Sequence, residues 1–178
     1  MIIKAIADRA TGRVLGAQIV GFEGVDKRID VLATAITFGA TAGDLFHLDL
    51  AYAPPYSTTK DPVAYTGMIL ENALHRGRPL ITAEALDARL AEGENVQVID
   101  ARSAAQYAKS HLETAESIPL ESLRAQAGQL DRDAVTVTYC NKGTTGNAAQ
   151  NLLLGKGFRQ VYNLSGGEKQ YRALHRKP

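Results

Sequence analysis

The chain has 178 residues, and 45% of them are hydrophobic, enough to bury one substantial core or two small ones. Its 20 basic residues nearly balance its 19 acidic ones, and a net charge of +1 excludes a global field that attracts nucleic acid or an acidic membrane surface. No apolar run approaches the ~20 residues that span a bilayer, so we expect a cytoplasmic protein without a membrane partner. A single cysteine excludes an intramolecular disulfide and a thiolate zinc site, and we expect no metal site.

The first 76 residues predict a β-hairpin followed by helices. Apolar and polar residues alternate over Ile2–Ala7 and Val14–Val20, on either side of the turn-forming stretch DRATGR. From residue 25 to residue 38, apolar side chains recur at helical spacing. Asp61 and Pro62 are typical of the N-cap and first residue of another helix.

The basic stretch HRGRP, with its glycine and proline, is typical of a boundary between domains. We predict one domain over residues 1–76, a linker over 77–80 and a second domain over 81–178. The second domain begins with a helical stretch, ITAEALDARLAEG, and continues with the strand-like runs VQVID, AVTVTYC and QVYNL, separated by helix-forming segments. This alternation predicts an α/β fold, with a parallel sheet flanked by helices.

The cysteine lies between the strand-like AVTVTY and the helix-forming GNAAQNLLLGKGF. Cys140 is therefore expected at the C-terminal end of a parallel strand, where ligand sites gather in α/β sheets. Small residues after it allow backbone N–H groups to point inward and stabilise a thiolate or persulfide anion, to which Lys142 adds a positive charge. The alternative is a buried cysteine that only fills the core. Asn141, Lys142 and Gly143 are poor core companions, so we expect a nucleophile.

Residues from about Leu80 onward resemble a rhodanese homology domain. The segments that carry the resemblance are VIDAR at 98–102, Tyr107, His111, SIPLESLR at 117–124, the Cys140 loop and NLSGG at 163–167. The resemblance implies that Cys140 accepts a sulfane sulfur, carries it as a persulfide and passes it to a thiol or cyanide. In this sulfurtransferase, the residues expected to cradle the persulfide and bind substrate are Asn141, Lys142, Gly143, Thr144, Thr145 and Gly146.

The loop CNKGTT lacks arginine at two positions where related loops carry it. It is similar to the Cys-Arg-Lys-Gly-Val-Thr loop of thiosulfate-using rhodaneses, with Asn141 in place of the arginine. Many single-domain rhodaneses carry arginine at the position of Thr145. We therefore do not expect thiosulfate to be the preferred donor. Phosphatases of the related Cys-x5-Arg type need an arginine where this chain has Gly146, so a phosphatase is rejected.

Two further charged residues border the active site in the rhodanese family. Asp100 and Arg102 follow a predicted strand, and we assign them a supporting, structural role, because such pairs more often position than react. His111 precedes a buried Ile-Pro and is expected to act as a hydrogen-bonding post rather than a base.

The N-terminal half resembles the dimerisation domain of flavin-dependent pyridine nucleotide-disulfide reductases. The likeness rests on TGRVLGAQIVGFEGVDKRIDVLATAITFGATAGDL and on LDLAYAPPYSTTKDPV. The order of the two halves matches coenzyme A disulfide or persulfide reductases that end in a rhodanese domain, and it implies a partial α+β domain and a homodimer. Tyrosines of this domain approach the partner's thiol site in that family, which makes Tyr52 and Tyr56 candidates; packing within a rigid loop is the alternative.

The chain has no GxGxxG motif after a strand, so we expect no cofactor for this chain and FAD and NAD(P)H only in a full-length reductase. The resemblance to the dimerisation domain begins partway into that domain. We therefore interpret the chain as a fragment or a natural truncation without reductase activity of its own. The expected partners are small sulfur donors, thiol acceptors such as coenzyme A persulfide, and a reductase. Three functions remain open: a rhodanese sulfurtransferase, the C-terminal fragment of an NADH oxidase-like coenzyme A disulfide/persulfide reductase, and a non-catalytic dimerising interaction module.

Overall fold

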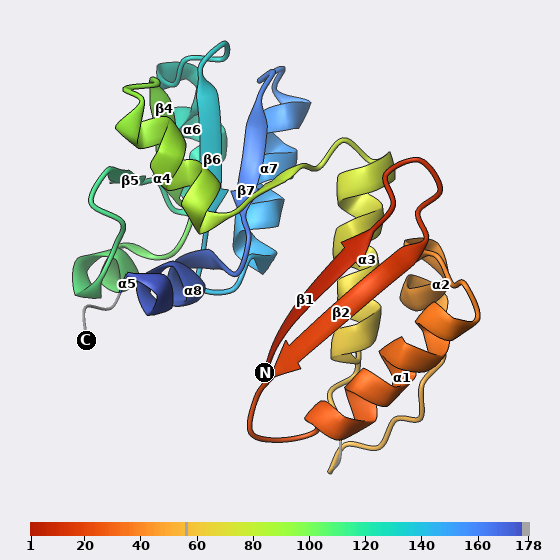
Figure 1. Ribbon diagram of the computed structural model, residues 1–178. Helices are drawn as coiled ribbons and strands as arrows, with labels where there is room; N and C mark the ends of the chain where they lie inside the picture. Colours follow the sequence, from red (N-terminus) through yellow and green to blue (C-terminus); the bar gives the residue numbers. More distant parts are fainter. Residues whose placement is uncertain (56, 176–178) are drawn as a thin grey trace. The chain divides into compact units, whose positions relative to one another are not determined.

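The computed structural model describes residues 1–55 and 57–175 (Figure 1). The chain divides into two compact units, Met1–Gly77 and Arg78–Pro178. Within the described residues, no helix has the length and apolar character needed to cross a membrane.

The first unit is an antiparallel hairpin with three helices (Figure 1). Its elements are β1 (Ile2–Ala7), β2 (Val14–Val20), α1 (Val25–Thr37), α2 (Ala42–His47) and α3 (Pro62–His75). Its core is built by Val14, Leu32, Leu45 and Val63, with Ile3 and Ile19 of the hairpin packed against them. The predicted alternation is confirmed, because one face of the hairpin packs on the helices while the other face is exposed.

The helix starts in this unit follow from their caps. The Asp61 carboxylate accepts a hydrogen bond from the Val63 N–H at 3.0 Å, and Pro62 occupies the first turn, which confirms the predicted start of α3. The sequence prediction missed α2. The signal for it is a capping box, in which the side chains of Thr41 and Asp44 each bond the backbone N–H of the other residue.

The second unit is a five-stranded parallel sheet in the order β3-β7-β6-β4-β5, with helices on both faces (Figure 1). Its strands are β3 (Leu80–Ile81), β4 (Val96–Asp100), β5 (Ala115–Ser117), β6 (Val135–Tyr139) and β7 (Val161–Leu164). Its helices are α4 (Ala83–Ala91), α5 (Ala104–Lys109), α6 (Leu120–Gln126), α7 (Thr144–Gly155) and α8 (Gly167–Leu174), and Ala127–Gln129 form a 3-10 turn. The predicted α/β class is confirmed.

Two apolar clusters cover the two faces of this sheet. On one face Ile99 packs with Leu123 of α6 and Leu153 of α7. On the other face Val98 packs with Leu86 of α4. Adjacent residues of β4 thus point to opposite faces, as the pleat of a doubly covered strand requires.

The first strand of the sheet lies where the sequence predicted other structure. Leu80 falls within the predicted linker, and Ile81 within a predicted helix. The structure places both in β3, where they pair with Asn163 and Leu164 of β7. A two-residue edge strand has no periodicity of its own, and only its partner strand orders it.

Candidate functional site

Cys140 follows β6 directly, at the centre of the sheet. The neighbouring strand β4 ends at Asp100, so the loops after β4 and β6 lie side by side. From β4 the chain continues to β5 on one side, and from β6 it continues to β7 on the other. The loops after β4 and β6 therefore diverge, and ligand sites of open α/β sheets form in the crevice between such loops. The pocket there has a volume of about 490 Å³. It is lined by Ala101, Arg102, Ser103, Gln106, Pro119, Leu120, Glu121, Cys140, Asn141, Lys142, Thr144 and Thr145.

The sulfur atom receives a backbone hydrogen bond from its own loop. The Gly143 N–H donates to Cys140 Sγ at 3.1 Å, and α7 begins at the next residue. Gly143 has a φ of 113°, a conformation that side chains rarely allow, so the turn needs glycine here. An inward N–H at a helix N-terminus stabilises negative charge on sulfur. Cys140 is only 5% exposed, so this charge would be largely shielded from water.

Helix α8 holds the other side of the loop. The Glu168 N–H donates to the Cys140 carbonyl at 2.8 Å, and the Lys169 N–H donates to the Asn141 carbonyl at 3.3 Å. Gly167 has a φ of 61°, and a side chain there would overlap the Cys140 carbonyl oxygen. The close approach of α8 to the cysteine loop therefore depends on glycine at this position.

A buried ion pair connects the end of β4 to the loop. The Arg102 guanidinium lies 2.6 Å from Asp100 Oδ2 through Nη2, and its Nε also donates to this carboxylate. Its Nη1 donates to Asn141 Oδ1 at 3.0 Å and lies 3.5 Å from Glu168 Oε2. Burial alone would lower the pKa of Arg102, but the hydrogen bonds and charge of Asp100 outweigh it, and this pKa is raised above its ordinary value.

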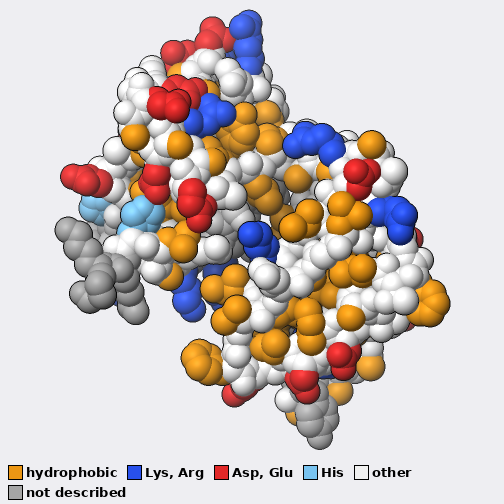
Figure 2. All heavy atoms as spheres, in the orientation of Figure 1, with side chains coloured by type: hydrophobic (Ala, Val, Ile, Leu, Met, Phe, Trp, Pro, Cys, Tyr) orange, Lys and Arg blue, Asp and Glu red, His pale blue; other side chains and the backbone are white. Residues whose placement is uncertain are grey.

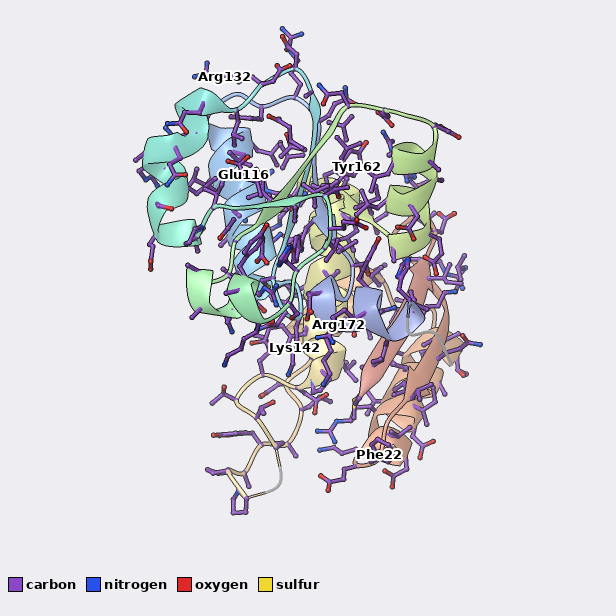
Figure 3. All side chains as sticks on the ribbon, turned by 90° about the vertical axis from the view of Figure 1, so that its left-hand side faces the viewer. Phe22, Glu116, Arg132, Lys142, Tyr162 and Arg172 are labelled. Carbon is purple, nitrogen blue, oxygen red and sulfur yellow. The ribbon has the colours of Figure 1, made fainter. Side chains whose placement is uncertain are left out.

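The charges near the sulfur differ in their availability. Two carboxylates, those of Asp100 and Glu168, face Arg102, so its charge is largely neutralised. Lys142 is exposed and, within the described part of the chain, forms no ion pair. Figure 3 shows Lys142 at the end of the unit where α5 and α8 also lie. Among the described residues that line the pocket, Lys142 therefore carries the positive charge that is left free for an anion.

The structure brings most of the predicted site residues together. Asn141, Lys142, Thr144 and Thr145 line the pocket beside Cys140. Gly146 instead lies buried behind the loop, where a Cβ atom would overlap Asn163 Oδ1 and come within 3.1 Å of Tyr139 Cα. The space that a phosphatase arginine would need is therefore already filled.

The remaining candidates lie elsewhere. His111 stacks on the Tyr107 ring and its Nδ1 lies 2.9 Å from the Tyr107 carbonyl, the arrangement of a hydrogen-bonding post. Tyr52 is half exposed in the first unit, and Tyr56 lies outside the described residues. No cluster of three or more metal-ligating side chains occurs among the described residues.

The predicted site residues did not include Glu168 and Asn163, whose side chains hold Arg102 and the cysteine loop. Glu168 contacts Arg102 and accepts a hydrogen bond from the Ser110 hydroxyl at 2.8 Å. Asn163 donates to the Gly143 carbonyl at 3.1 Å. Asn163 begins the NLSGG segment and Glu168 follows it directly. The sequence therefore indicated this region, but the roles of the two side chains depend on the fold.

The chain is similar to known proteins in both halves. Residues 82–174, just over half of the chain, match the model of the rhodanese-like domain, and residues 1–63 match that of the pyridine nucleotide-disulphide oxidoreductase dimerisation domain. The NAD(P)H sulfur oxidoreductase (CoA-dependent) of Pyrococcus furiosus is 44% identical over 69 residues, which cover 39% of this chain and 15% of that protein. The coenzyme A disulfide reductase of Staphylococcus aureus (strain bovine RF122) is 43% identical over 65 residues, or 36% of this chain and 15% of that protein.

Two solved structures match nearly the whole chain. Reduced Bacillus anthracis CoADR-RHD superimposes with a TM-score of 0.88 at 36% identity, covering 95% of this chain and 30% of that one. The NAD-dependent persulfide reductase from A. fulgidus gives a TM-score of 0.80 at 35% identity, covering 94% and 29%. The chain thus spans less than a third of the length of these relatives. It belongs to the rhodanese-like domain family, and its rhodanese domain follows a pyridine nucleotide-disulfide oxidoreductase dimerisation domain.

Proposed function

We propose that this chain carries sulfane sulfur on Cys140 as the C-terminal region of a flavin-dependent coenzyme A disulfide/persulfide reductase. The observation that supports it most is the Gly143 N–H directed at Cys140 Sγ, at the edge of an open pocket. An amide that donates to sulfur stabilises the thiolate before transfer and, in the same turn, favours an anionic persulfide after it. The similarity of both halves to coenzyme A disulfide and persulfide reductases supports the wider context.

The transfer takes place in two displacements. In the first, the Cys140 thiolate attacks the outer sulfur of a donor persulfide, R–S–SH. The S–S bond of the donor breaks, R–S⁻ leaves with the bonding electron pair and takes up the persulfide proton, and Cys140 becomes a persulfide. In the second, an acceptor thiolate or cyanide attacks the outer sulfur and restores the Cys140 thiolate. No net oxidation or reduction occurs, so this exchange requires no cofactor.

The pocket assigns separate roles to the flanking residues. Lys142 supplies an unpaired positive charge for an anionic donor, while Arg102 holds the Asn141 carboxamide in place. FAD and NAD(P)H would bind to the redox domains of a full-length reductase and would supply the electrons for reduction of the transferred sulfur. The described residues take part in the steps before that reduction.

The first unit is proposed to hold two copies of the chain together. Its hairpin exposes Ile2, Ile6 and Val20 on the face turned away from the core. Figure 2 shows hydrophobic side chains gathered on this face. Exposed apolar area of this kind is expected at the interface of a homodimer, consistent with the dimerisation domain to which residues 1–63 are similar.

Intact mass of the purified chain tests the proposal. We expect treatment with coenzyme A persulfide to add one sulfur atom, and cyanide to remove it as thiocyanate. Cys140→Ser should gain no sulfur. If the unmodified chain also gains none, with polysulfide and thiosulfate tried as further donors, the proposal is wrong and the dimerising interaction module replaces it.

A further inference from the structure

The backbone around the Cys140 sulfur is held in place by hydrogen bonds that its carbonyl groups accept. A loop whose N–H groups point inward must turn its carbonyl oxygens outward, and each buried carbonyl then needs a donor. Helix α8 supplies the donors for Cys140 and Asn141. The Thr138 hydroxyl donates to the Gly146 carbonyl at 2.9 Å, and Asn163 Nδ2 donates to the Gly143 carbonyl at 3.1 Å.

The Asn163 carboxamide has one hydrogen-bonded atom and one atom without a hydrogen-bond partner among the described residues. The residue lies on β7 and is only 5% exposed. Its Nδ2 bonds the Gly143 carbonyl, but its Oδ1 is buried and has no hydrogen-bond partner among the described residues. Burying an unpaired carbonyl oxygen is unfavourable, and a hydrocarbon side chain of the same size would avoid it. The carboxamide at this position is therefore explained by the bond that it donates.

The residue that receives this bond is the one that contacts sulfur. Gly143 donates its N–H to Cys140 Sγ, and it has a φ of 113° and a ψ of −20°. Glycine adopts these angles easily, but without a side chain it does little to hold the backbone in them. The Asn147 N–H also bonds the Gly143 carbonyl at 2.8 Å as part of α7. Asn163 Nδ2 adds a second hydrogen bond from the sheet, so the Gly143 carbonyl is fixed between a helix and a strand, one Cα away from the N–H that bonds sulfur.

Gly146 provides the room for this hydrogen bond. A Cβ atom at residue 146 would overlap Asn163 Oδ1, so any other residue would displace the carboxamide from the Gly143 carbonyl. The absence of a side chain at 146 and the presence of a carboxamide at 163 are thus two parts of one arrangement behind the cysteine loop.

We propose that Asn163 is a positioning residue for Cys140: its carboxamide holds the Gly143 carbonyl, and this restrains the φ and ψ of Gly143 so that the N–H on the other side of its Cα stays directed at the sulfur. Asn163 does not contact the sulfur and acts only through Gly143. The inference rests on the proposed function in so far as the stabilised charge is that of a sulfur-transferring cysteine.

Asn163→Asp tests the donor with little change in shape. The carboxylate cannot donate to the Gly143 carbonyl and brings a negative charge behind the cysteine loop. We expect the profile of alkylation rate against pH to move by about one unit toward higher pH. The rate of Cys140 alkylation by iodoacetamide at neutral pH should therefore fall about tenfold. Asn151→Asp is the matched control, since Asn151 is exposed on α7 and outside the pocket. Its profile should coincide with that of the unmodified chain.

Asn163→Leu separates reactivity from stability. It removes the donor together with the unpaired oxygen, so its melting temperature should equal or exceed that of the unmodified chain while its alkylation profile still moves toward higher pH. A folded Asn163→Leu with an unchanged profile would overturn the proposal. A shifted profile in a chain that takes up no sulfur from coenzyme A persulfide would instead support the role of Asn163 and contradict the proposed function.

Discussion

Each unit of the molecule contains a buried arginine–aspartate pair, and the two pairs serve different ends. In the first unit Arg28 Nη2 lies 2.8 Å from Asp61 Oδ2, and Arg28 Nη1 donates to the Gly24 carbonyl at 3.2 Å. This pair fastens α1 to the start of α3. In the second unit, Arg102 binds Asp100 in the same way but continues to the cysteine loop.

The comparison shows that burial and pairing do not identify a functional charge. Both pairs are almost fully enclosed, and in both the arginine also reaches acceptors other than the aspartate. The two pairs differ in where those other acceptors lie. Arg28 bonds backbone of its own helix start, whereas Arg102 bonds Asn141, the residue next to the sulfur-bearing cysteine.

The largest effect is expected from Arg102→Leu. It leaves the Asp100 carboxylate buried without its partner, which costs about 3–5 kcal/mol of stability. It also frees the Asn141 side chain, so the rate at which Cys140 is loaded with sulfur should fall more than tenfold. This corresponds to an activation barrier raised by more than ~1.4 kcal/mol. Urea unfolding and intact mass after persulfide treatment measure the two effects.

Arg28→Leu is the counterpart in the first unit. It removes the partner of the buried Asp61 carboxylate, and the same physical cost of about 3–5 kcal/mol applies. Hydrogen exchange should show the loss of protection in residues 1–77, while loading of Cys140 stays unchanged. Equal losses of loading in the two arginine variants would contradict the distinction between the pairs.

Gly167→Ala is expected to have the next largest effect. The new methyl group would overlap the Cys140 carbonyl and would require a φ of 61°, so we expect a loss of about 1–3 kcal/mol and slower loading of sulfur. Gly157→Ala is the control, because Gly157 has a φ of 89° but a Cβ atom there would meet no atom within 4 Å. It should lose stability without losing loading. Thermal unfolding and the rate of sulfur uptake test both variants.

A smaller effect is expected from Thr41→Ala in the first unit. Loss of the Thr41 hydroxyl leaves the Asp44 N–H at the start of α2 without its acceptor and should cost about 1 kcal/mol. Hydrogen exchange in Ala42–His47 measures this loss. Sulfur loading on Cys140 should remain unchanged, and a change there would show that the helix caps of the first unit influence the site.

The smallest expected effect is a pH dependence at the end of α8. His175 Nδ1 lies 2.7 Å from the Tyr171 carbonyl and Nε2 lies 2.8 Å from Asp87 Oδ2, an arrangement in which both nitrogens donate only when the ring is charged. The hydrogen bond to the Tyr171 carbonyl, followed by the contact and charge of Asp87 and the charge of Glu84, raises the pKa of His175.

The raised pKa of His175 determines how the stabilising effect of this contact depends on pH. Its stabilisation is fully present below the ordinary histidine value of ~6.5 and is lost as the pH rises through the higher value in the folded chain. Amide hydrogen exchange in Gly167–Leu174 should therefore gain protection as the pH falls through this window, after correction for the intrinsic rate. Asp87→Asn should flatten that dependence, and an unchanged dependence in this variant would show that another group is responsible.

The amino-acid sequence determined those features that short-range patterns encode. Alternation in Ile2–Ala7 and Val14–Val20 predicted the hairpin, and Asp61 with Pro62 predicted the start of α3. The strand-like run before Cys140 and the helix-forming run after it predicted a cysteine at the C-terminal edge of a parallel sheet. These features follow from backbone propensities and caps that act within one or two turns.

The tertiary structure decided what surrounds the sulfur. Arg102 reaches Asn141 across 39 residues of sequence, and Ser110 reaches Glu168 across 58. The bond from Asn163 to Gly143 likewise exists only because β7 pairs beside β6. The short strands β3 and β5 belong to the same class, since two or three residues acquire order only from a neighbouring strand. Contacts between distant segments depend on sheet order and register, which no local pattern of residues specifies.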